Sequence, residues 1–481
     1  MAPPQKHLRV AVALLSLACC ATPASADAPA YAVVVSRQTF QDPAWKQVAD
    51  TLLAKHNGQL ILYETSVRDS LPTLKQLFPR YTCFVATPAQ ATRQFVADVH
   101  RLTRKLDDDP YTDTIWGILT GFDAANALRI AKHTDPLIVH KVASGTDVAL
   151  DLCEEGAWYC ELTQGRMVRK EKGQSPRESK GPPDTTQALV NTLNDDHADL
   201  FITSGHATER DWQIGYRYRN GSFRSKAGKL LGVDTQGKTY PIDSPNPKVY
   251  LPIGNCLMGH IDSTDAMALA WMNSAAVYQM IGYTVPSWFG YAGWGCLDYF
   301  LEQPGRYTFA EAFHANHHAL IHRLNTCFPD LAKLEPKPES TFAGPVTLSD
   351  AAKRDKITAN DGRGLLFDRD VVAFYGDPAW SARMADHDKP FDQSLSVVGD
   401  LYTLEIRPRL GDKSFQPVNT NGSQRGFRPF IQFLPHRVKQ VQVIEGQELH
   451  PVVTDDFVLV PNPRLCDPAR AYRVIFRAQP F

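Results

Sequence analysis

Residues 199–207 read DLFITSGHA, an apolar run that stops at a Ser-Gly pair and then presents His206. The pattern recurs at residues 248–256, KVYLPIGNC, where an apolar run stops at a Gly-Asn pair and presents Cys256. Short apolar runs bounded by small or turn-forming residues predict buried strands of a parallel sheet. Sites in open α/β sheets lie just beyond the carboxyl ends of the strands. We therefore expect His206 and Cys256 to face one another at one edge of such a sheet.

Strand-like and helix-like segments alternate along most of the chain. The strand patterns YAVVVS, QLILYE, YTCFVA and TIWGILT are separated by helical patterns, an alternation typical of βαβ units. The polar residues 163–186 predict an exposed loop. Beyond about residue 390, short alternating segments separated by turns predict an antiparallel β-sandwich. The expected fold is α/β, with a parallel sheet flanked by helices and a C-terminal sandwich.

The start of the chain has the features of a secretory signal. Basic residues precede a short apolar segment, and Ala24 and Ala26 frame a cleavage position. Residues 1–26 therefore predict a signal peptide and a secreted or periplasmic protein, with lipid attachment at Cys19 as a minor alternative. No later segment has about 18 uninterrupted apolar residues, so no transmembrane segment is expected in the mature chain.

Charge and cysteine content narrow the function classes. The chain has 51 basic and 52 acidic residues and a net charge of −1 at pH 7, which gives no indication of a nucleic-acid partner. Export makes disulfides feasible. Two of the nine cysteines lie in the predicted signal, and the odd remainder indicates at least one unpaired thiol. Cys256 is our candidate for that thiol.

A histidine and a cysteine at neighbouring strand ends suit nucleophilic catalysis. The thiolate is the reactive form of cysteine, and a nearby imidazole can remove the thiol proton and later protonate a leaving amine. Glu209 or Asp211, just past His206, could orient the imidazole, although a solvated turn is the favoured interpretation of both. His260 also lies close to Cys256 in the sequence, but only His206 has a strand end of its own.

Another group of histidines lies on one predicted helix. His314, His318 and His322 recur every four residues on one face, and stacked imidazoles can bind zinc or copper. No carboxylate falls within this stripe and the HExxH motif is absent, so structural helix histidines are favoured. A metal-dependent hydrolase is the more distant hypothesis, and we expect no metal at the catalytic site.

The order of these motifs resembles that of the gingipain-type cysteine peptidases, which have a caspase-like fold. The stretches FITSGHATERDW and YLPIGNCLMGHID resemble the two catalytic strand ends of the family, and VYQMIGYTVPSWFGYAGWG resembles its Trp-bearing loop. FAEAFHANHHALI and VVAFYGDPAW resemble a family helix and the closing strand and turn. The resemblance covers roughly residues 31–385, and the family carries an immunoglobulin-like domain next.

The resemblance implies a division of the chain into four parts. Residues 1–26 would be the signal peptide, 27–135 an N-terminal α/β subdomain, 136–388 the caspase-like catalytic subdomain and 389–481 an immunoglobulin-like β-sandwich. The last part carries no nucleophile–base pair, so support or surface attachment is its expected role.

Carried onto this chain, the resemblance implies an exported cysteine endopeptidase. Cys256 would be the nucleophile and His206 the general acid/base, and the backbone N–H groups of Cys256 and Ala207 would hold the oxyanion. Trp288 would form a wall of the substrate-binding pocket. The partners would be protein or peptide substrates; no cofactor is required, and structural calcium is compatible with the family.

Two questions stay open at this point. Family members that cleave after basic residues have an acidic group at the pocket base, for which Asp147, Asp151, Glu154 and Glu155 are the candidates. The family also has glycine after the catalytic histidine, where this chain has Ala207. If that position required a positive φ, alanine would strain the backbone, and the alternative is a catalytically inactive binding or envelope protein.

Overall fold

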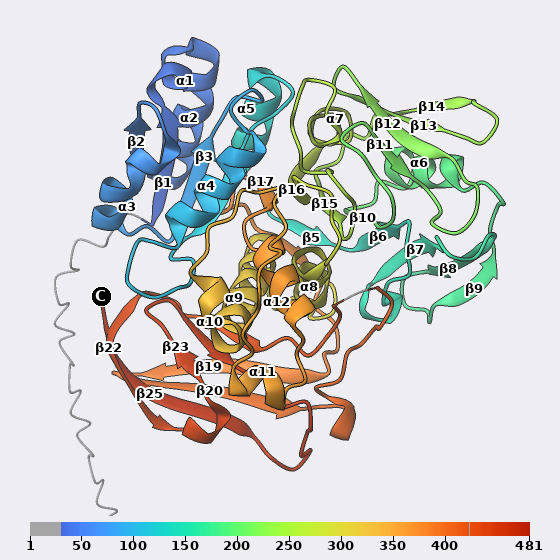
Figure 1. The fold of residues 1–481 in the computed structure, drawn as a ribbon. Coiled ribbons are helices and arrows are strands. Elements are labelled where there is room, and N and C mark those ends of the chain that lie inside the picture. The colour runs from blue at the N-terminus through green and yellow to red at the C-terminus, as the bar shows by residue number, and fades with distance from the viewer. Residues whose placement is uncertain (1–29, 423) are drawn as a thin grey trace, which may run out of the picture.

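The computed structural model describes residues 30–422 and 424–481, so the predicted signal peptide and Cys19 lie outside the described residues. A twelve-stranded sheet crosses the α/β part of the molecule (Figure 1). Its strands, in spatial order, are β2 (Gln59–Tyr63), β1 (Tyr31–Ser36), β3 (Tyr81–Val85), β4 (Ile115–Leu119), β17 (Val372–Gly376), β16 (Val277–Tyr283), β15 (Lys248–Pro252), β10 (Leu200–Thr203), β6 (Lys141–Ser144), β7 (Glu155–Tyr159), β8 (Arg166–Lys170) and β9 (Arg177–Lys180).

The direction of the strands reverses once in the middle of this sheet. The set from β2 to β17 is parallel, and so is the set from β16 to β7. The two sets meet at the antiparallel pair β16–β17. The predicted α/β fold is confirmed, but the sheet is mixed because β17 returns late in the chain to complete the N-terminal set.

Residues 163–186 do not form the exposed loop that their polarity predicts. They contain β8 and β9, which extend the sheet edge as antiparallel additions to β7. Every residue of β9 is exposed, so the strand has no apolar face and its sequence carries no strand periodicity.

Helices pack on the sheet and on one another. They are α1 (Arg37–Gln41), α2 (Pro43–His56), α3 (Leu71–Leu77), α4 (Arg93–Thr103), α5 (Ala124–Lys132), α6 (Thr186–Asn194), α7 (Met267–Ser274), α8 (Tyr291–Phe300), α9 (Phe309–Cys327), α10 (Pro329–Ala332), α11 (Asp350–Arg354) and α12 (Ala359–Asp368). Helix α9 begins at a capping box in which Thr308 and Glu311 satisfy one another's backbone N–H groups. Helices α8 and α9 pack on each other and lie between the sheet and the C-terminal strands (Figure 1). None of the helices in the described residues has the length and apolar character needed to cross a bilayer.

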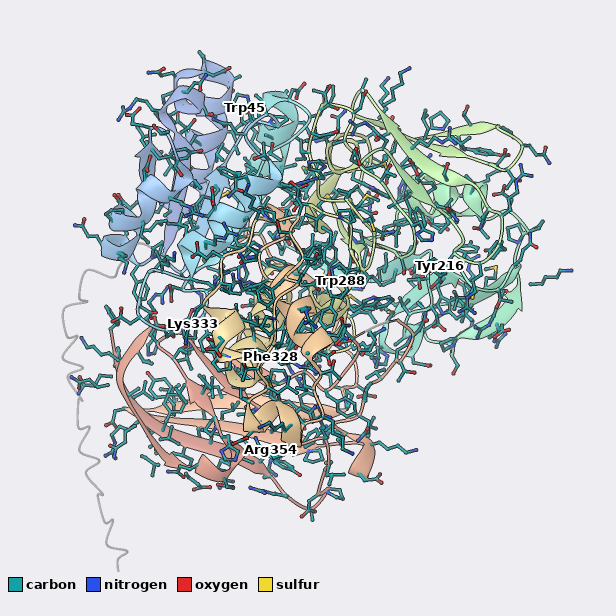
Figure 2. The ribbon with its side chains drawn as sticks, in the orientation of Figure 1. Trp45, Tyr216, Trp288, Phe328, Lys333 and Arg354 are labelled. Atoms are coloured by element: carbon teal, nitrogen blue, oxygen red, sulfur yellow. The ribbon has the colours of Figure 1, made fainter. Side chains whose placement is uncertain are left out.

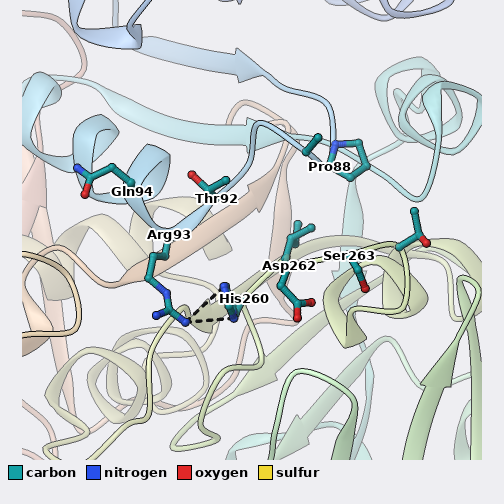
Figure 3. A pocket seen from close by; sticks show the side chains of 10 residues that line it. Pro88, Thr92, Arg93, Gln94, His260, Asp262 and Ser263 are labelled. Atoms are coloured by element: carbon teal, nitrogen blue, oxygen red, sulfur yellow. Dashed lines mark hydrogen bonds between the residues drawn. The ribbon is translucent and has the colours of Figure 1, made fainter.

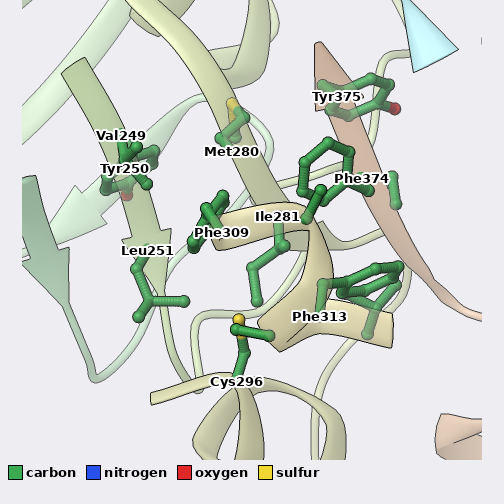
Figure 4. Close-up of a cluster of buried hydrophobic side chains, with 14 of the residues drawn as sticks. Val249, Tyr250, Leu251, Met280, Ile281, Cys296, Phe309, Phe313, Phe374 and Tyr375 are labelled. Atoms are coloured by element: carbon green, nitrogen blue, oxygen red, sulfur yellow. The ribbon is translucent and has the colours of Figure 1, made fainter. Parts of the chain in front are cut away.

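The main hydrophobic core lies where the two strand sets meet. Side chains from β15, β16 and β17 pack there against α8 and α9 (Figure 4). Phe309 and Phe313 of α9 contact the ring of Phe374 at centroid distances of 5.7 and 5.5 Å. Cys296 is fully buried in this core, where burial raises the pKa of its thiol. It is therefore a packing residue and not a reactive one.

The C-terminal region consists of two antiparallel sheets. One contains β19 (Phe391–Val398), β20 (Leu401–Pro408), β25 (Tyr472–Pro480) and β22 (Val438–Glu445), and the other β21 (Phe430–Phe433), β24 (Phe457–Val460) and β23 (Val452–Val453). Successive side chains of a strand point to opposite faces. In β24, Val458 and Val460 enter the core of this region, whereas Phe457 and Leu459 enter the main core. The second sheet therefore joins the C-terminal region to the α/β part through shared packing.

Two smaller sheets complete the described structure. A four-stranded antiparallel sheet follows β10 and contains β11 (Asp211–Gln213), β12 (Ser222–Lys226), β13 (Lys229–Val233) and β14 (Thr239–Ile242). Strands β5 (Leu137–Val139) and β18 (Ala382–Met384) pair in parallel.

Candidate active site

The two stretches that present His206 and Cys256 are neighbouring strands. β10 and β15 are parallel and completely buried, with Thr203 opposite Pro252 at their carboxyl ends. Just beyond β10, Gly205 has a φ of 92°, a left-handed conformation that glycine adopts without steric cost. The small-residue turn in the sequence thus serves to reverse the backbone immediately before His206.

Asn255 fastens the two strand ends to each other. Its side chain is fully buried; the amide oxygen accepts a hydrogen bond from Thr203 Oγ1 at 2.7 Å, and the amide nitrogen donates to Gly205 O at 3.0 Å. A buried amide with both ends satisfied holds a single geometry. Asn255, which sequence reasoning treats only as a turn residue, therefore fixes the loop of His206 relative to the loop of Cys256.

A cavity of about 320 Å³ lies beyond these strand ends. His206, Cys256 and Trp288, which the sequence predicts to act together, all line it. Trp288 is 44% exposed, which places its ring at the rim and not in the core; Figure 2 labels it together with Tyr216, another lining residue. The remaining lining residues are Glu161, Leu162, Ser204, Gly205, Gly254, Ser287, Gly290, Trp294, Asn421 and Gly422.

The Cys256 thiol is free and partly exposed. Its Sγ accepts a hydrogen bond from the Ser287 N–H at 3.2 Å and lies 3.6 Å from Ser287 O. The exposed His206 ring stacks on Tyr216 with centroids 4.9 Å apart. No hydrogen bond joins His206 to Cys256 within the described residues, as is common for catalytic pairs without substrate.

The amides expected to hold an oxyanion have no acceptor within the described part of the chain. Neither Ala207 nor Cys256 donates its backbone N–H to another residue there. The φ of Ala207 lies outside the left-handed region, so alanine at this position causes no backbone strain. The Asp211 carboxylate accepts from Thr208 Oγ1 at 2.8 Å. Neither it nor Glu209 hydrogen-bonds His206 in the described residues, so the imidazole is oriented by stacking on Tyr216.

The acid in the cavity is Glu161, not one of the residues expected from the sequence. None of the four expected acids lines the cavity: Asp147, Asp151, Glu154 and Glu155. Glu161 follows the carboxyl end of β7 by two residues, so the same strand-end rule that identifies His206 could have found it.

Only one of the two oxygens of the Glu161 carboxylate has a hydrogen-bond partner in the described residues. The residue is 6% exposed, and Oε1 accepts from Thr146 Oγ1 at 2.6 Å. Oε2 is buried without a hydrogen-bond partner in the described residues. Burial raises the pKa of this carboxyl above its usual range. A buried acceptor without a hydrogen bond costs free energy, unless a bound ligand donates a hydrogen bond to it.

Other histidines take no part in this cavity. His260 lies in a separate cavity, where Arg93 Nη2 approaches its ring nitrogens to 3.2 and 3.3 Å (Figure 3). His314 and His318 of α9 are buried, and His314 Nε2 bonds the backbone of Trp116. Burial lowers the pKa of His314 to about 3, so the ring is neutral. The helical stripe therefore has a structural role, as the favoured interpretation states.

One group of side chains in the described part of the chain could hold a metal ion. Asp107, Asp109 and Asp113 bring one oxygen each within 4.8 Å of one another. Burial, then neighbouring carboxylates, raise the pKa of Asp109 to about 7 and that of Asp113 to about 10. An all-oxygen set fits a hard cation such as calcium. None of these residues lines the cavity of Cys256.

Comparisons with known proteins give a structural similarity only. No family model matches the chain, and no curated protein matches it. The chain is similar to a crystal structure of the Arg-specific cysteine proteinase gingipain R, with 9% identity, a TM-score of 0.45 and coverage of 93% of this chain and 94% of the other. It is also similar to the complex of the pro- and mature domains of RgpB from Porphyromonas gingivalis, with 10% identity, a TM-score of 0.43 and coverage of 91% and 94%.

Proposed function

We propose that the protein is an exported cysteine peptidase of gingipain type, with a caspase-like catalytic part and an immunoglobulin-like C-terminal sandwich. One observation carries the catalytic proposal: a free thiol and an imidazole, on neighbouring strand ends joined by Asn255, line one cavity. The backbone N–H groups of Cys256 and Ala207, at the same two strand ends, have no acceptor in the described residues. Free thiols elsewhere in the main core, such as Cys83, are buried and cannot meet a substrate.

The reaction follows from these groups. His206 removes the Cys256 thiol proton, and the thiolate attacks the carbonyl carbon of the scissile bond. The N–H groups of Cys256 and Ala207 stabilise the oxyanion of the tetrahedral intermediate. When the C–N bond breaks, His206 donates its proton to the leaving amine. Water, deprotonated by the same imidazole, then hydrolyses the thioester and regenerates the thiol.

Two further parts of the proposal concern regions away from the cavity. The signal at residues 1–26 would direct export, and Asp107, Asp109 and Asp113 would hold a structural calcium ion that neutralises their charge. Strain at Ala207 would favour the alternative of an inactive binding or envelope protein, and the φ of that residue gives this argument no support.

The proposed reaction can be tested by covalent labelling. Peptide acyloxymethyl ketones, which alkylate active-site thiolates, should label the wild-type protein once per chain and should fail to label Cys256→Ala. Cys466 offers a matched control, because it is the other partly exposed free cysteine in the described residues, and Cys466→Ala should be labelled like the wild type. Labelling that persists in Cys256→Ala would exclude Cys256 as the nucleophile.

Glu161 gives the pocket a preference for a cationic side chain. Its free Oε2 needs a donor, and a hydrogen bond to a charged group contributes about 1.5–3 kcal/mol. We therefore expect Glu161→Gln to lower kcat/KM for lysine or arginine substrates by about 10- to 100-fold relative to a norleucine substrate. Glu154→Gln is the matched control, because Glu154 lies outside the cavity, and it should leave the ratio unchanged.

This preference should also depend on pH. Because burial raises the pKa of Glu161, the carboxyl is neutral at low pH and gains its charge only as the pH passes that raised value. The lysine-to-norleucine ratio of kcat/KM should therefore increase with pH in the wild type, at pH values above the usual titration of a glutamate, and stay flat in Glu161→Gln. If this ratio increased equally in the wild type and in Glu161→Gln, the group that titrates would not be Glu161.

A further inference from the structure

We infer that the C-terminal region contributes a specificity-determining residue, Asn421, to the substrate pocket. This inference rests on the proposed function. Asn421 and Gly422 line the cavity of Cys256, although they lie on the connection between β20 and β21. We call the described parts of residues 416–428 the strap. This contribution would add a role in recognition to the support or surface attachment that is expected of the C-terminal region.

The strap is anchored on α8, the helix that starts beside the cavity. Asp298 accepts hydrogen bonds from Arg425 Nε at 2.7 Å, the Gly426 N–H at 2.9 Å and Arg428 Nε at 2.9 Å. The side chains of Asp298, Arg425 and Arg428 are each at most 4% exposed. The Arg428 guanidinium also lies 3.9 Å from the ring centroid of Tyr291. Buried, multiply bonded charges hold the strap in one position.

The tip of the strap fits closely against the cavity wall. Gly422 has a φ of 97°, and a Cβ added there would lie 2.4 Å from the Trp294 ring. Only glycine permits both this conformation and this approach. The backbone of Asn421 is held on both sides, because its N–H donates to Asn419 Oδ1 at 2.7 Å and its carbonyl accepts from Arg425 Nη1 at 2.8 Å. The side chain of Asn421 therefore has a fixed origin at the cavity.

Asn421 and Glu161 each leave a buried polar atom unpaired in the same cavity. Nδ2 of Asn421 and Oε2 of Glu161 have no hydrogen-bond partner within the described residues. The two groups lie near each other, since a hydrogen-bonding interaction with the Asn421 side chain is among the causes that counteract the burial-raised pKa of Glu161, although the two atoms lie outside hydrogen-bond geometry. Two such polar groups from separate regions of the chain, at the wall of one cavity, indicate a ligand group that satisfies both.

A cationic side chain meets this requirement. In the cavity without substrate, the Asn421 amide nitrogen lies toward the carboxylate. Rotation of the amide by 180° exchanges its two ends and turns the oxygen toward an incoming donor group. The Asn421 oxygen and Glu161 Oε2 then form a pair of acceptors for the several donors of a guanidinium or ammonium group. Glu161 supplies the charge, and Asn421 shares the donors and sets their direction.

The test compares Asn421→Leu, which keeps the size of the side chain and removes its polar atoms, with the wild type. For substrates with arginine or lysine before the scissile bond, kcat/KM should fall about tenfold, mainly through KM. The value for a norleucine substrate and the rate of Cys256 alkylation by iodoacetamide should stay unchanged. Asn462→Leu is the matched control in the same region, because Asn462 bonds Phe415 O outside the cavity.

Binding separates this inference from the proposed reaction. Peptide amides ending in arginine, lysine or norleucine can be titrated against Cys256→Ala and the double variant Cys256→Ala/Asn421→Leu. Weaker binding of the two cationic peptides alone in the double variant supports the role of Asn421, even if Cys256 proves not to be the nucleophile. Equal weakening of all three peptides, or no change, would overturn the inference. A general loss of folding would appear as altered iodoacetamide reactivity of Asn421→Leu and would equally overturn it.

Discussion

Substitution His206→Ala should lower kcat/KM for peptide hydrolysis by about 10³-fold or more, with little change in stability. The imidazole acts twice in the proposed reaction, as the base for Cys256 and as the acid for the leaving amine, and general acid–base catalysis alone contributes about 10²- to 10⁴-fold. His206 is exposed and contacts mainly Tyr216, so its removal opens no core cavity. Steady-state rates and urea unfolding of both proteins measure the two effects.

His260→Ala is the matched control for this prediction. His260 is closer to Cys256 in the sequence, but it lines a different cavity and contacts Arg93. We expect His260→Ala to change kcat/KM by less than about tenfold. If His260→Ala lowered kcat/KM more than His206→Ala does, His260 would be the acid/base residue. That result would contradict the assignment made from the strand ends.

The part of the site that could be predicted from the sequence is the part made by local backbone rules. The turns after β10 and β15 follow buried apolar runs, and parallel pairing brings the carboxyl ends of neighbouring strands to one edge. His206 and Cys256 could therefore be placed at one cavity without knowledge of any other contact. Trp288 could be placed there only by resemblance, since nothing in its local pattern distinguishes a rim aromatic from a core one.

Glu161 was missed because several acids precede it in a short stretch, and only the end of β7 distinguishes it from them. The antiparallel pair β16–β17 was also missed. β17 is a buried apolar strand like its neighbours, and its sequence carries no sign of the partner beside it. Pairings over long sequence separations depend on how the whole sheet assembles, so single-segment patterns predict that such a strand exists but not where it lies.

The packing of the C-terminal region on the α/β part could not be predicted from the sequence, for a different reason. An alternating strand predicts two faces, one of which is normally exposed. In β24 both faces are buried, with Phe457 and Leu459 in the main core. The ion pairs that anchor the strap could not be predicted from the sequence either. Arg425 and Arg428 have the sequence pattern of solvated loop residues, and only the structure shows that they contact Asp298.

Substitution Asp298→Ala should therefore have the largest effect on stability of any single change to the contacts that anchor the strap. The buried Arg428 guanidinium would lose its carboxylate partner, and the buried Arg425 guanidinium would keep only Glu302. Breaking a buried ion pair by removing one partner costs about 3–5 kcal/mol. We expect a decrease of that size in the free energy of unfolding, measured by urea denaturation followed through tryptophan fluorescence.

The matched control is Asp330→Ala, which removes an aspartate whose ion pair with Lys333 is 72–76% exposed. Exposed pairs contribute about 0–1 kcal/mol, so this variant should unfold like the wild type. Because the strap reaches the cavity, Asp298→Ala should also reduce the preference for cationic substrates while Cys256 stays reactive to iodoacetamide. Equal stabilities of Asp298→Ala and Asp330→Ala would mean that water reaches the Arg425 and Arg428 guanidinium groups, and the strap would then not be held in place by these charges.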